Sequence, residues 1–268
     1  MKKIIAALLV SGVLIAARSP GLYAGAARES AKTITVGATP VPHAELLNLI
    51  AGDLAAAGYT LKVVEYNDYV QPNAALAAGD LDANFFQHLP YLESNAEWKS
   101  ALAAVTGVHV EPFGLYSNRL KNIAELPDGA TIAIPNDPTN GGRAFLLLQA
   151  NGLLTLKPGT GLEATTLDIS ANPKNLRFHE LESAQLPLAL PDVDAAAING
   201  NYALRAGLNP VRDSLIIEGA DSPYVNYLVV KKGSENDPRI LALSRALTSQ
   251  KVKDYILSHY DGGVVAVF

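Results

Sequence analysis

The strongest constraint on the fold is an alternation of strand and helix patterns along nearly the whole chain. Residues 32–39, KTITVGAT, form a short β-branched run, and residues 43–58, HAELLNLIAGDLAAAG, carry apolar side chains at helical spacing up to a glycine. Residues 60–66, TLKVVEY, are again strand-like, and the same rhythm recurs to the end of the chain. It predicts an α/β protein with central, mostly parallel sheets that carry helices on both faces.

Two shifts in composition predict that the chain is divided into two lobes. Residues 112–130 change from apolar to charged and end in a Pro-Asp-Gly turn, as expected where a chain leaves one lobe for another. A return near 222–233 would let the last helix pack on the first lobe. We therefore predict a first lobe of 32–118 plus 228–268, a second lobe of 119–227 that starts and ends at the hinge, and a ligand cleft between them.

Charge and composition exclude several classes of function. The formal net charge is −5, so the chain has no basic surface for nucleic acid. It has no cysteine and no Gly-x-Ser-x-Gly motif, and its five histidines, at positions 43, 88, 109, 179 and 259, show no ligand spacing along the sequence. We expect no catalysis, no cofactor and no metal site.

The first residues have the layout of a secretory signal. A positive start, Met1-Lys2-Lys3, precedes an apolar run over 4–17, and a small-x-small cleavage site ends at Ala26. Arg18 follows IAA, where a bacterial lipoprotein would carry its lipidated cysteine. We expect residues 1–26 to be a signal peptide and the mature chain to be periplasmic, without a lipid on cysteine.

A candidate anion site lies in residues 134–154, IPNDPTNGGRAFLLLQANGLL. The pattern predicts a strand end, a turn, and a helix that opens with free amides at Gly141, Gly142 and Arg143. The Arg143 guanidinium adds a planar fork of donors, so the segment favours a small carboxylate or phosphate. The lysine and hydroxyl of a Walker loop are missing. The alternative is a surface arginine beside glycines that only shape a turn.

Aromatic side chains concentrate in residues 67–98 of a chain that is only 7% aromatic. Side chains alternate along the predicted strand DANFFQH, so Phe86 and His88 point one way and Phe85 and Gln87 the other. We assign Phe86 and His88 to the cleft and Phe85 to the core. The alternative is a wholly buried cluster with a hydrogen-bonded histidine.

Several longer segments resemble one family. They are VGATPVPHAELL, DYVQPNAALAAGDLDANFFQHLPYLE, HVEPFGLYS, LPDGATIAIPNDPTNGGRAFLLLQANGL, DVDAAAINGNYALRAGLNP and SPYVNYLVV. From residue 34 to the C-terminus the chain is similar to the methionine-binding lipoproteins, the substrate-binding components of methionine ABC importers. The resemblance implies a two-lobed, type II-like periplasmic-binding-protein fold that closes on free L-methionine and delivers it to a permease with its ATPase subunit.

The resemblance also implies a set of ligand-binding residues. Arg143 takes the place of the arginine that grips the amino acid carboxylate, and Asn201 and Asn226 match amides that bind the ammonium and carboxylate. The matching wall around the thioether consists of Tyr69, Phe86 and His88, with Tyr91 and Asn140 as further members of the site. Because amides can take the ammonium, no buried carboxylate is required. The alternatives are another small apolar amino acid, a methionine-containing dipeptide, or a metal ion.

Overall fold

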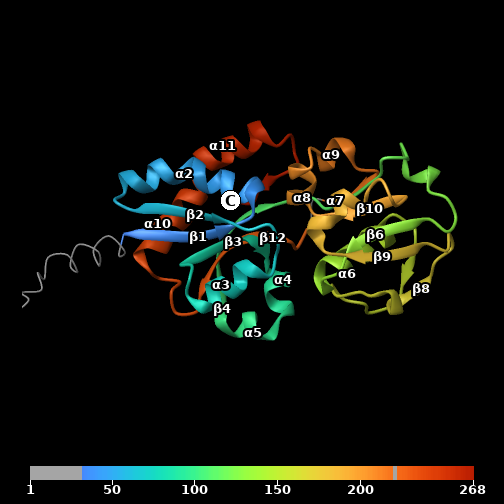
Figure 1. The fold of residues 1–268 in the computed structure, drawn as a ribbon, viewed down its shortest axis with the longest axis horizontal. Coiled ribbons are helices and arrows are strands. Elements are labelled where there is room, and N and C mark those ends of the chain that lie inside the picture. Colours follow the sequence, from blue (N-terminus) through green and yellow to red (C-terminus); the bar gives the residue numbers. More distant parts are fainter. Residues whose placement is uncertain (1–31, 220–221) are drawn as a thin grey trace, which may run out of the picture. The chain divides into compact units, whose positions relative to one another are not determined.

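The computed structural model describes residues 32–219 and 222–268. Residues Thr33–Phe268 form one compact unit. The expected signal peptide, residues 1–26, lies outside the described residues. In the unit, two separate sheets each carry helices, as Figure 1 shows.

The first sheet has six strands in the order β13-β4-β12-β3-β1-β2. Their bounds are β1 Thr33–Ala38, β2 Thr60–Glu65, β3 Ala83–His88, β4 Leu102–Val110, β12 Val225–Lys231 and β13 Val265–Ala266. β1 pairs in parallel with β2 and β3, whereas β12 runs antiparallel to β3 and β4. The sheet is therefore mixed: its parallel part comes from βαβ units and its antiparallel part from the returning chain.

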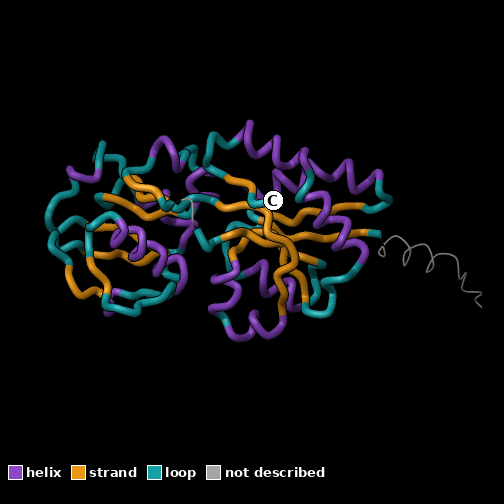
Figure 2. The backbone as a smooth tube through the Cα atoms, turned by 180° about the vertical axis from the view of Figure 1, so that it is seen from behind, coloured by secondary structure: helices purple, strands orange, loops and turns teal. Residues whose placement is uncertain are grey.

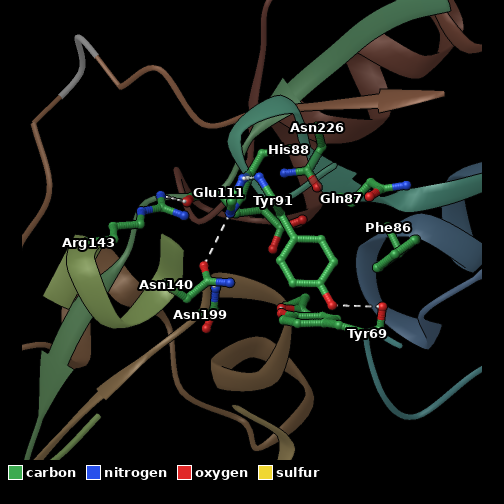
Figure 3. Close-up of a pocket in the computed structure, with 12 residues that line it drawn as sticks. Tyr69, Phe86, Gln87, His88, Tyr91, Glu111, Asn140, Arg143, Asn199 and Asn226 are labelled. Atoms are coloured by element: carbon green, nitrogen blue, oxygen red, sulfur yellow. Dashed lines mark hydrogen bonds between the residues drawn. The ribbon is translucent and has the colours of Figure 1, made fainter. Parts of the chain in front are cut away.

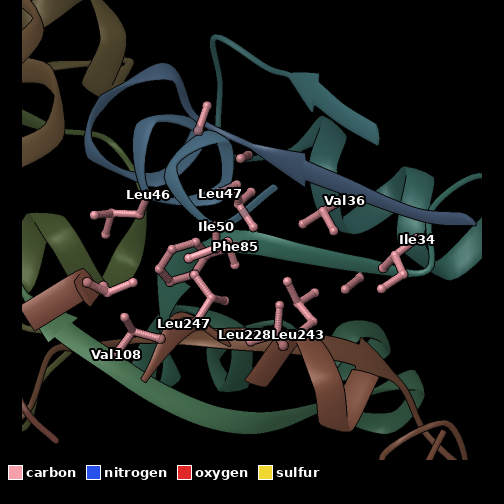
Figure 4. Packing of buried hydrophobic residues seen from close by; sticks show 14 of the residues in the cluster. Ile34, Val36, Leu46, Leu47, Ile50, Phe85, Val108, Leu228, Leu243 and Leu247 are labelled. Atoms are coloured by element: carbon pink, nitrogen blue, oxygen red, sulfur yellow. The ribbon is translucent and has the colours of Figure 1, made fainter. Parts of the chain in front are cut away.

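Helices cover both faces of the first sheet. One face carries α2 (Glu45–Ala56), α10 (Pro238–Leu247) and α11 (Gln250–His259), whose apolar side chains pack on β1 and β3 in one core cluster (Figure 4). The other carries α3 (Gln71–Ala78), α4 (Leu89–Ser94) and α5 (Ala96–Ala101), with a second cluster around Leu76, Leu92 and Val229. In the tube view of Figure 2 these two groups of helices lie on opposite sides of the orange strands.

The second sheet has five strands in the order β11-β5-β10-β6-β9. Their bounds are β5 Gly114–Tyr116, β6 Thr131–Pro135, β9 Arg177–Leu181, β10 Ala195–Ile198 and β11 Ile216–Ile217. β10, β6 and β9 are parallel, and β5 is antiparallel to both β10 and β11. This sheet is also mixed, and its antiparallel strand is β5, the first strand that the chain forms after it enters this lobe.

The helices of the second sheet also lie on both faces. α6 (Pro138–Ala150) packs on one face, and α7 (Leu186–Ala189) and α8 (Gly200–Arg205) contribute to the cluster on the other. Smaller elements complete this part of the chain: α9 Pro210–Asp213, the hairpin β7 Thr155–Leu156 with β8 Ile169–Ala171, and short helical turns at Ile123–Glu125, Thr166–Asp168 and Ser183–Gln185. The α/β class and the two-lobed fold predicted from the sequence are confirmed.

By sheet membership, the chain crosses between the lobes at 111–113 and returns at 218–224. Both crossings precede the predicted limits at 118/119 and 227/228. Those limits followed the change to polar composition, but β5 and β12 are apolar strands that already pair in the sheet they enter. The hydrogen-bonded ladder, and not the composition, marks each crossing.

The last helical pattern, expected as one helix, forms two. α10 ends at Leu247 and α11 begins at Gln250. Between them the Thr248 hydroxyl donates to the Ser244 carbonyl at 3.0 Å, and Ser249 adopts extended backbone as the N-cap of α11. Short hydroxyl side chains compete in this way for backbone groups and favour helix ends over helix interiors.

Candidate functional site

One cavity between the two sheets is lined by residues of both lobes (Figure 3). About 330 Å³ of space at the site is not filled by atoms, and this volume includes space open to solvent. All eight residues predicted from the sequence line the cavity: Tyr69, Phe86, His88, Tyr91, Asn140, Arg143, Asn201 and Asn226. Four other residues complete the lining: Gln87, Glu111, Asn199 and Gly200. The structure thus brings these eight residues together around one cavity, and their binding of a ligand stays a prediction.

One end of the cavity is aromatic. The ring of Tyr69 lies 5.8 Å from those of both Phe86 and Tyr91, centroid to centroid, and Phe86 and Tyr91 are 6.1 Å apart. As expected from the alternation along β3, Phe86 faces the cavity while Phe85 is fully buried in the core of the first lobe. The three rings therefore form a slot with an apolar interior.

His88 connects the aromatic end to the second lobe. Its Nδ1 accepts a hydrogen bond from the Tyr91 amide at 3.1 Å, so the ring proton is on Nε2, which donates to Asn140 Oδ1 at 3.1 Å. Burial, and then the charge of Arg143, lower the pKa of His88 to about 3. His88 is therefore neutral at physiological pH and acts as a fixed donor to the second lobe.

Asn140 is held by the protein on all sides. Its Oδ1 accepts from His88 and from Asn199 Nδ2, the latter at 2.7 Å, and its Nδ2 donates to the two carboxylate oxygens of Asp137 at 3.0 and 2.9 Å. These contacts use the amide on both its donor and acceptor sides. The geometry gives Asn140 the role of orienting His88.

The start of α6 differs from the prediction. The helix begins at Pro138, with the Asp137 side chain accepting from the Asn140 amide at 2.9 Å, and the Gly141 amide donates to the Asp137 carbonyl at 2.9 Å. The amides of Gly142 and Arg143 therefore belong to the helix interior and are not free for an anion, which corrects the expectation. A sequence pattern locates a helix end only approximately, and here Pro138 sets it earlier.

The two glycines of α6 allow close packing. A Cβ on Gly142 would lie 2.0 Å from the Leu162 carbonyl oxygen, and one on Gly141 would lie 2.9 Å from that of Pro135. Both contacts are with backbone, which cannot move aside cheaply. The glycines bring α6 against the end of β6 and against the loop at 162–164.

The fork of Arg143 is already occupied, which corrects the expectation that it is open to a bidentate ligand. Nε donates to Glu218 Oε1 at 2.9 Å and Nη2 donates to Glu218 Oε2, while Nη2 also donates to the Glu111 carbonyl at 3.0 Å. Among the described residues Nη1 has no hydrogen-bond partner. Arg143 is buried and lines the cavity, so a ligand meets the guanidinium at Nη1.

The two remaining amides present donors to the cavity. Asn201 Oδ1 accepts from the Tyr69 hydroxyl at 2.6 Å, and Asn226 Oδ1 accepts from His43 Nε2 at 3.2 Å. Each oxygen thus has a protein partner, while neither Nδ2 group has one among the described residues. Two N–H donors in the same cavity suit a carboxylate better than an ammonium group.

A buried cluster of His43, His109 and Glu111 adjoins the polar end of the cavity. His109 Nε2 lies 2.8 Å from Glu111 Oε1 and His43 Nε2 lies 3.3 Å from the same oxygen. Burial raises the pKa of Glu111, and it lowers that of His43 to about 4 and that of His109 to about 3. The backbone N–H of Asn201 donates a hydrogen bond to the Glu111 carboxylate. Gly200 has no side chain, which leaves room for the side chain of Glu111.

This cluster corrects two expectations. The histidines were expected to be scattered, yet β4 and the turn Pro40–Ala44 bring His43 and His109 together. The expected site required no buried carboxylate, yet Glu111 is one and lines the cavity. The donor atoms lie within 4.8 Å of one another, a spacing that could hold a metal ion. As folded, the three side chains hydrogen-bond each other, and a dication there would be close to the Arg143 cation.

We expect the free energy of unfolding to fall by roughly 2 kcal/mol or more between pH 7 and pH 5. The unfolded chain protonates His43, His88 and His109 near pH 6.5, whereas in the folded protein their pKa values are about 4, 3 and 3. Below pH 6.5 the unfolded state therefore binds more protons, and each site costs about 1.4 kcal/mol per pH unit. Glu111 and Asp137 oppose this, because burial raises the pKa of each. Since three histidines act against two carboxyl groups, the net change is a lower free energy of unfolding at pH 5.

Urea unfolding at the two pH values, followed by the fluorescence of the one tryptophan, Trp98, measures this change. The variant His179→Ala, which alters an exposed histidine, should keep the same pH dependence. Equal stability at pH 7 and pH 5 in the parent protein would contradict the neutral, buried state of these rings.

Of the four other lining residues, Gln87 was expected to point away from the cleft together with Phe85, and its place in the lining corrects that expectation. The pairing of β3 with β12 shifts register at Phe86, which interrupts the alternation. Glu111, Asn199 and Gly200 were not assigned from the sequence; Glu111 directly follows β4, and Asn199 and Gly200 directly follow β10. The position of Asn199 and Gly200 at the carboxyl end of a parallel strand was an available indication, because ligands gather at such ends. For Glu111 the only indication was an acidic residue between the apolar runs that flank the first crossing.

The fold and the cavity define the class of protein: two α/β lobes, joined by two crossings, around one site, which is the architecture of the periplasmic substrate-binding proteins. The family model of the NlpA lipoproteins matches residues 34–268. The chain therefore belongs to the NlpA lipoprotein family.

Known relatives agree along most of the chain. The methionine-binding lipoprotein MetQ of Bacillus subtilis is 42% identical over 268 residues, 97% of this chain and 96% of its own. The D-methionine-binding lipoprotein MetQ of Escherichia coli is 43% identical over 211 residues, 78% of each chain. A solved nutrient binding protein from Burkholderia cenocepacia, bound to methionine, superposes with a TM-score of 0.84 at 44% identity, covering 88% of this chain and all of that one.

Proposed function

We propose that this protein captures free methionine in the cavity between its lobes and delivers it to the permease and ATPase subunits of an ABC importer. One observation carries the proposal: the cavity between the lobes is lined by three aromatic rings and also by a cation, two side-chain amides and a carboxylate. A zwitterionic amino acid with an unbranched apolar side chain is the small molecule that matches both groups of lining residues. The names of the relatives support methionine as that amino acid.

The free donors and acceptors suggest how each part of methionine is held. The carboxylate meets Arg143 Nη1 and the Nδ2 groups of Asn201 and Asn226. The ammonium meets the carboxylate of Glu111, whose negative charge offsets it in a site of low dielectric. This assignment replaces the expectation that amides alone bind the ammonium.

The thioether lies in the slot of Tyr69, Phe86 and Tyr91, where sulfur gains about 0.3–1.5 kcal/mol from each ring contact beyond burial. His88 closes the slot on the side of the second lobe through its bond to Asn140. The eight residues predicted from the sequence thus divide into direct contacts and, in the case of His88 and Asn140, groups that join the two lobes.

Direct hydrogen bonds between the lobes indicate a closed arrangement. They include His88 to Asn140, the Tyr69 hydroxyl to Asn201, and the Tyr202 hydroxyl to the Asn67 carbonyl at 3.1 Å. Because these bonds join the lobes across the cavity, methionine enters and leaves when the lobes separate at the two crossings. The proposal assigns no catalytic step and no cofactor to the chain.

Periplasmic localisation, through export directed by residues 1–26, is part of the same proposal. The relatives are named as lipoproteins, which places their family at the cell envelope. In the part of the chain that the structure describes, no helix is long and apolar enough to cross a membrane.

Calorimetry on refolded, ligand-free protein tests the function. The titrants are L-methionine, leucine, glycyl-methionine and zinc, which represent the proposed ligand and the three alternatives. We expect methionine to bind most tightly and its binding to be unchanged by EDTA. Tighter binding of leucine, of the dipeptide or of zinc would replace methionine with that ligand.

Selectivity for the thioether should be measurable with norleucine, which keeps the shape of methionine without sulfur. We expect norleucine to bind about 1 kcal/mol more weakly, the scale of a sulfur–aromatic contact. Valine, which leaves much of the slot empty, should lose several kcal/mol at about 25 cal/mol per Å² of lost burial. Competition binding gives these differences.

The matched variant is Phe86→Leu, which keeps an apolar side chain and removes one ring. It should narrow the gap between methionine and norleucine. Valine binding as tightly as methionine would show that the slot does not select the side chain.

A further inference from the structure

Glu218 holds Arg143 from outside the cavity. It is not among the residues that line the cavity, yet its two carboxylate oxygens accept from Nε and Nη2 of Arg143. The Ser222 hydroxyl donates at 3.0 Å to Glu218 Oε2, the same oxygen that accepts from Arg143 Nη2. A third side chain thus helps to hold the carboxylate of the ion pair.

The guanidinium has little freedom left. Its Cζ lies 4.0 Å from the centroid of the Tyr224 ring and 5.0 Å from that of Phe113, and Nη2 also donates to the Glu111 carbonyl. Two of its three nitrogens are bonded to Glu218. Only the edge that carries Nη1 is without a partner among the described residues, and this is the edge that a ligand carboxylate can meet.

Glu218 also ties Arg143 to both crossings between the lobes. It lies in the returning segment, directly after β11, and its amide donates to the Phe113 carbonyl of the first crossing at 2.8 Å. Arg143 reaches the first crossing through Glu111. The Arg143 guanidinium is therefore positioned by the backbone of the two crossings and not by α6 alone.

We propose that Glu218 is a positioning residue for ligand recognition, which fixes the Arg143 guanidinium so that Nη1 points at the ligand carboxylate. This inference rests on the proposed function and names a residue that acts on the ligand only through Arg143. The negative charge of Glu218 also balances that of Arg143 before a ligand arrives, so a zwitterion enters a site that is not strongly charged. A bidentate pair restrains an arginine in both position and plane.

The test compares two ligands that differ only in the group Arg143 is proposed to bind. L-Methionine carries a carboxylate and L-methioninol carries a hydroxyl in its place. Calorimetry with each ligand is performed on the parent protein and on Glu218→Gln, which is isosteric and breaks the fork because its NH₂ group opposes an Arg143 donor. Glu180→Gln, an exposed change on β9, is the matched control.

We expect Glu218→Gln to weaken methionine binding about tenfold, because a displaced Arg143 makes a poorer charge-assisted hydrogen bond to the ligand carboxylate. Methioninol has no carboxylate, so its binding should change by less than about threefold. The control should change neither. Ser222→Ala, which removes only the hydroxyl that holds Glu218, should act in the same direction with a smaller loss, and it provides the test should Glu218→Gln fail to fold.

Equal losses for both ligands would overturn the inference, because they would show a general structural role. Unchanged methionine binding would overturn it as well, since Glu218 would then have no effect on ligand recognition. Tighter binding would also overturn it, because Glu218 would then compete with the ligand for the Arg143 guanidinium. A parent protein that binds no methionine contradicts the proposed function itself. Failure of the inference alone is therefore distinguishable, because there the parent binds methionine.

Discussion

Replacing Arg143 with alanine is expected to weaken methionine binding by about 2–4 kcal/mol, roughly 30-fold to 1000-fold. The change removes the only cation that lines the cavity among the described residues and leaves the ligand carboxylate with the Nδ2 groups of Asn201 and Asn226. Without a positive partner, little compensates for the free energy that the ligand carboxylate loses when it leaves water. Calorimetry with L-methionine measures the loss.

The matched control is Arg177→Ala, which removes an exposed arginine of β9 and should leave the affinity unchanged. Thermal unfolding of Arg143→Ala is needed alongside, because this variant also leaves Glu218 without its partner. A folded Arg143→Ala protein with an affinity within about threefold of the parent would show that Arg143 is not the carboxylate site.

Gly142→Ala should destabilise the protein by about 3 kcal/mol or more, which places it at the upper end of overpacking effects. The added Cβ would lie 2.0 Å from the Leu162 carbonyl oxygen and 2.7 Å from the Ala164 amide nitrogen, so α6 or the loop must shift. Since Arg143 is the next residue of α6, methionine affinity should fall as well. Urea unfolding and calorimetry measure the two effects.

Gly52→Ala is the matched control for this substitution. Gly52 is an exposed glycine inside α2, and no neighbouring atom lies within 4 Å of the place that an added methyl group would take. Alanine there should therefore stabilise the protein by about 0.5–1 kcal/mol. If the two substitutions had the same effect, the close contact between α6 and the loop at 162–164 would be wrong.

The parts of the fold that depend on local pattern could be predicted from the sequence. The β-branched run of β1, the amphipathic helix α2 and the strand β2 follow from period and glycine alone. The crossings could not be placed, because β5 and β12 are apolar strands whose sheet is decided by pairing with distant partners. Hydrogen-bonded register of that kind is not encoded in composition.

The candidate site divides in the same way. The aromatic residues could be predicted because strand alternation alone sends Phe86 and Phe85 to opposite faces. The pairing of Arg143 with Glu218, 75 residues further along, could not, and neither could the meeting of His43 with Glu111. A sequence shows which charges are present, whereas the sheet order decides which of them meet.

A crystal of the protein with selenomethionine as ligand would show directly where methionine binds. Protein made with ordinary methionine contains no selenium, so any anomalous selenium peak comes from the ligand. We predict one strong peak in the slot between Tyr69, Phe86 and Tyr91, about 5 Å from the rings, with the ligand carboxylate at Arg143 Nη1. An empty cavity at saturating ligand, or a selenium peak at the Arg143 end, would contradict the account.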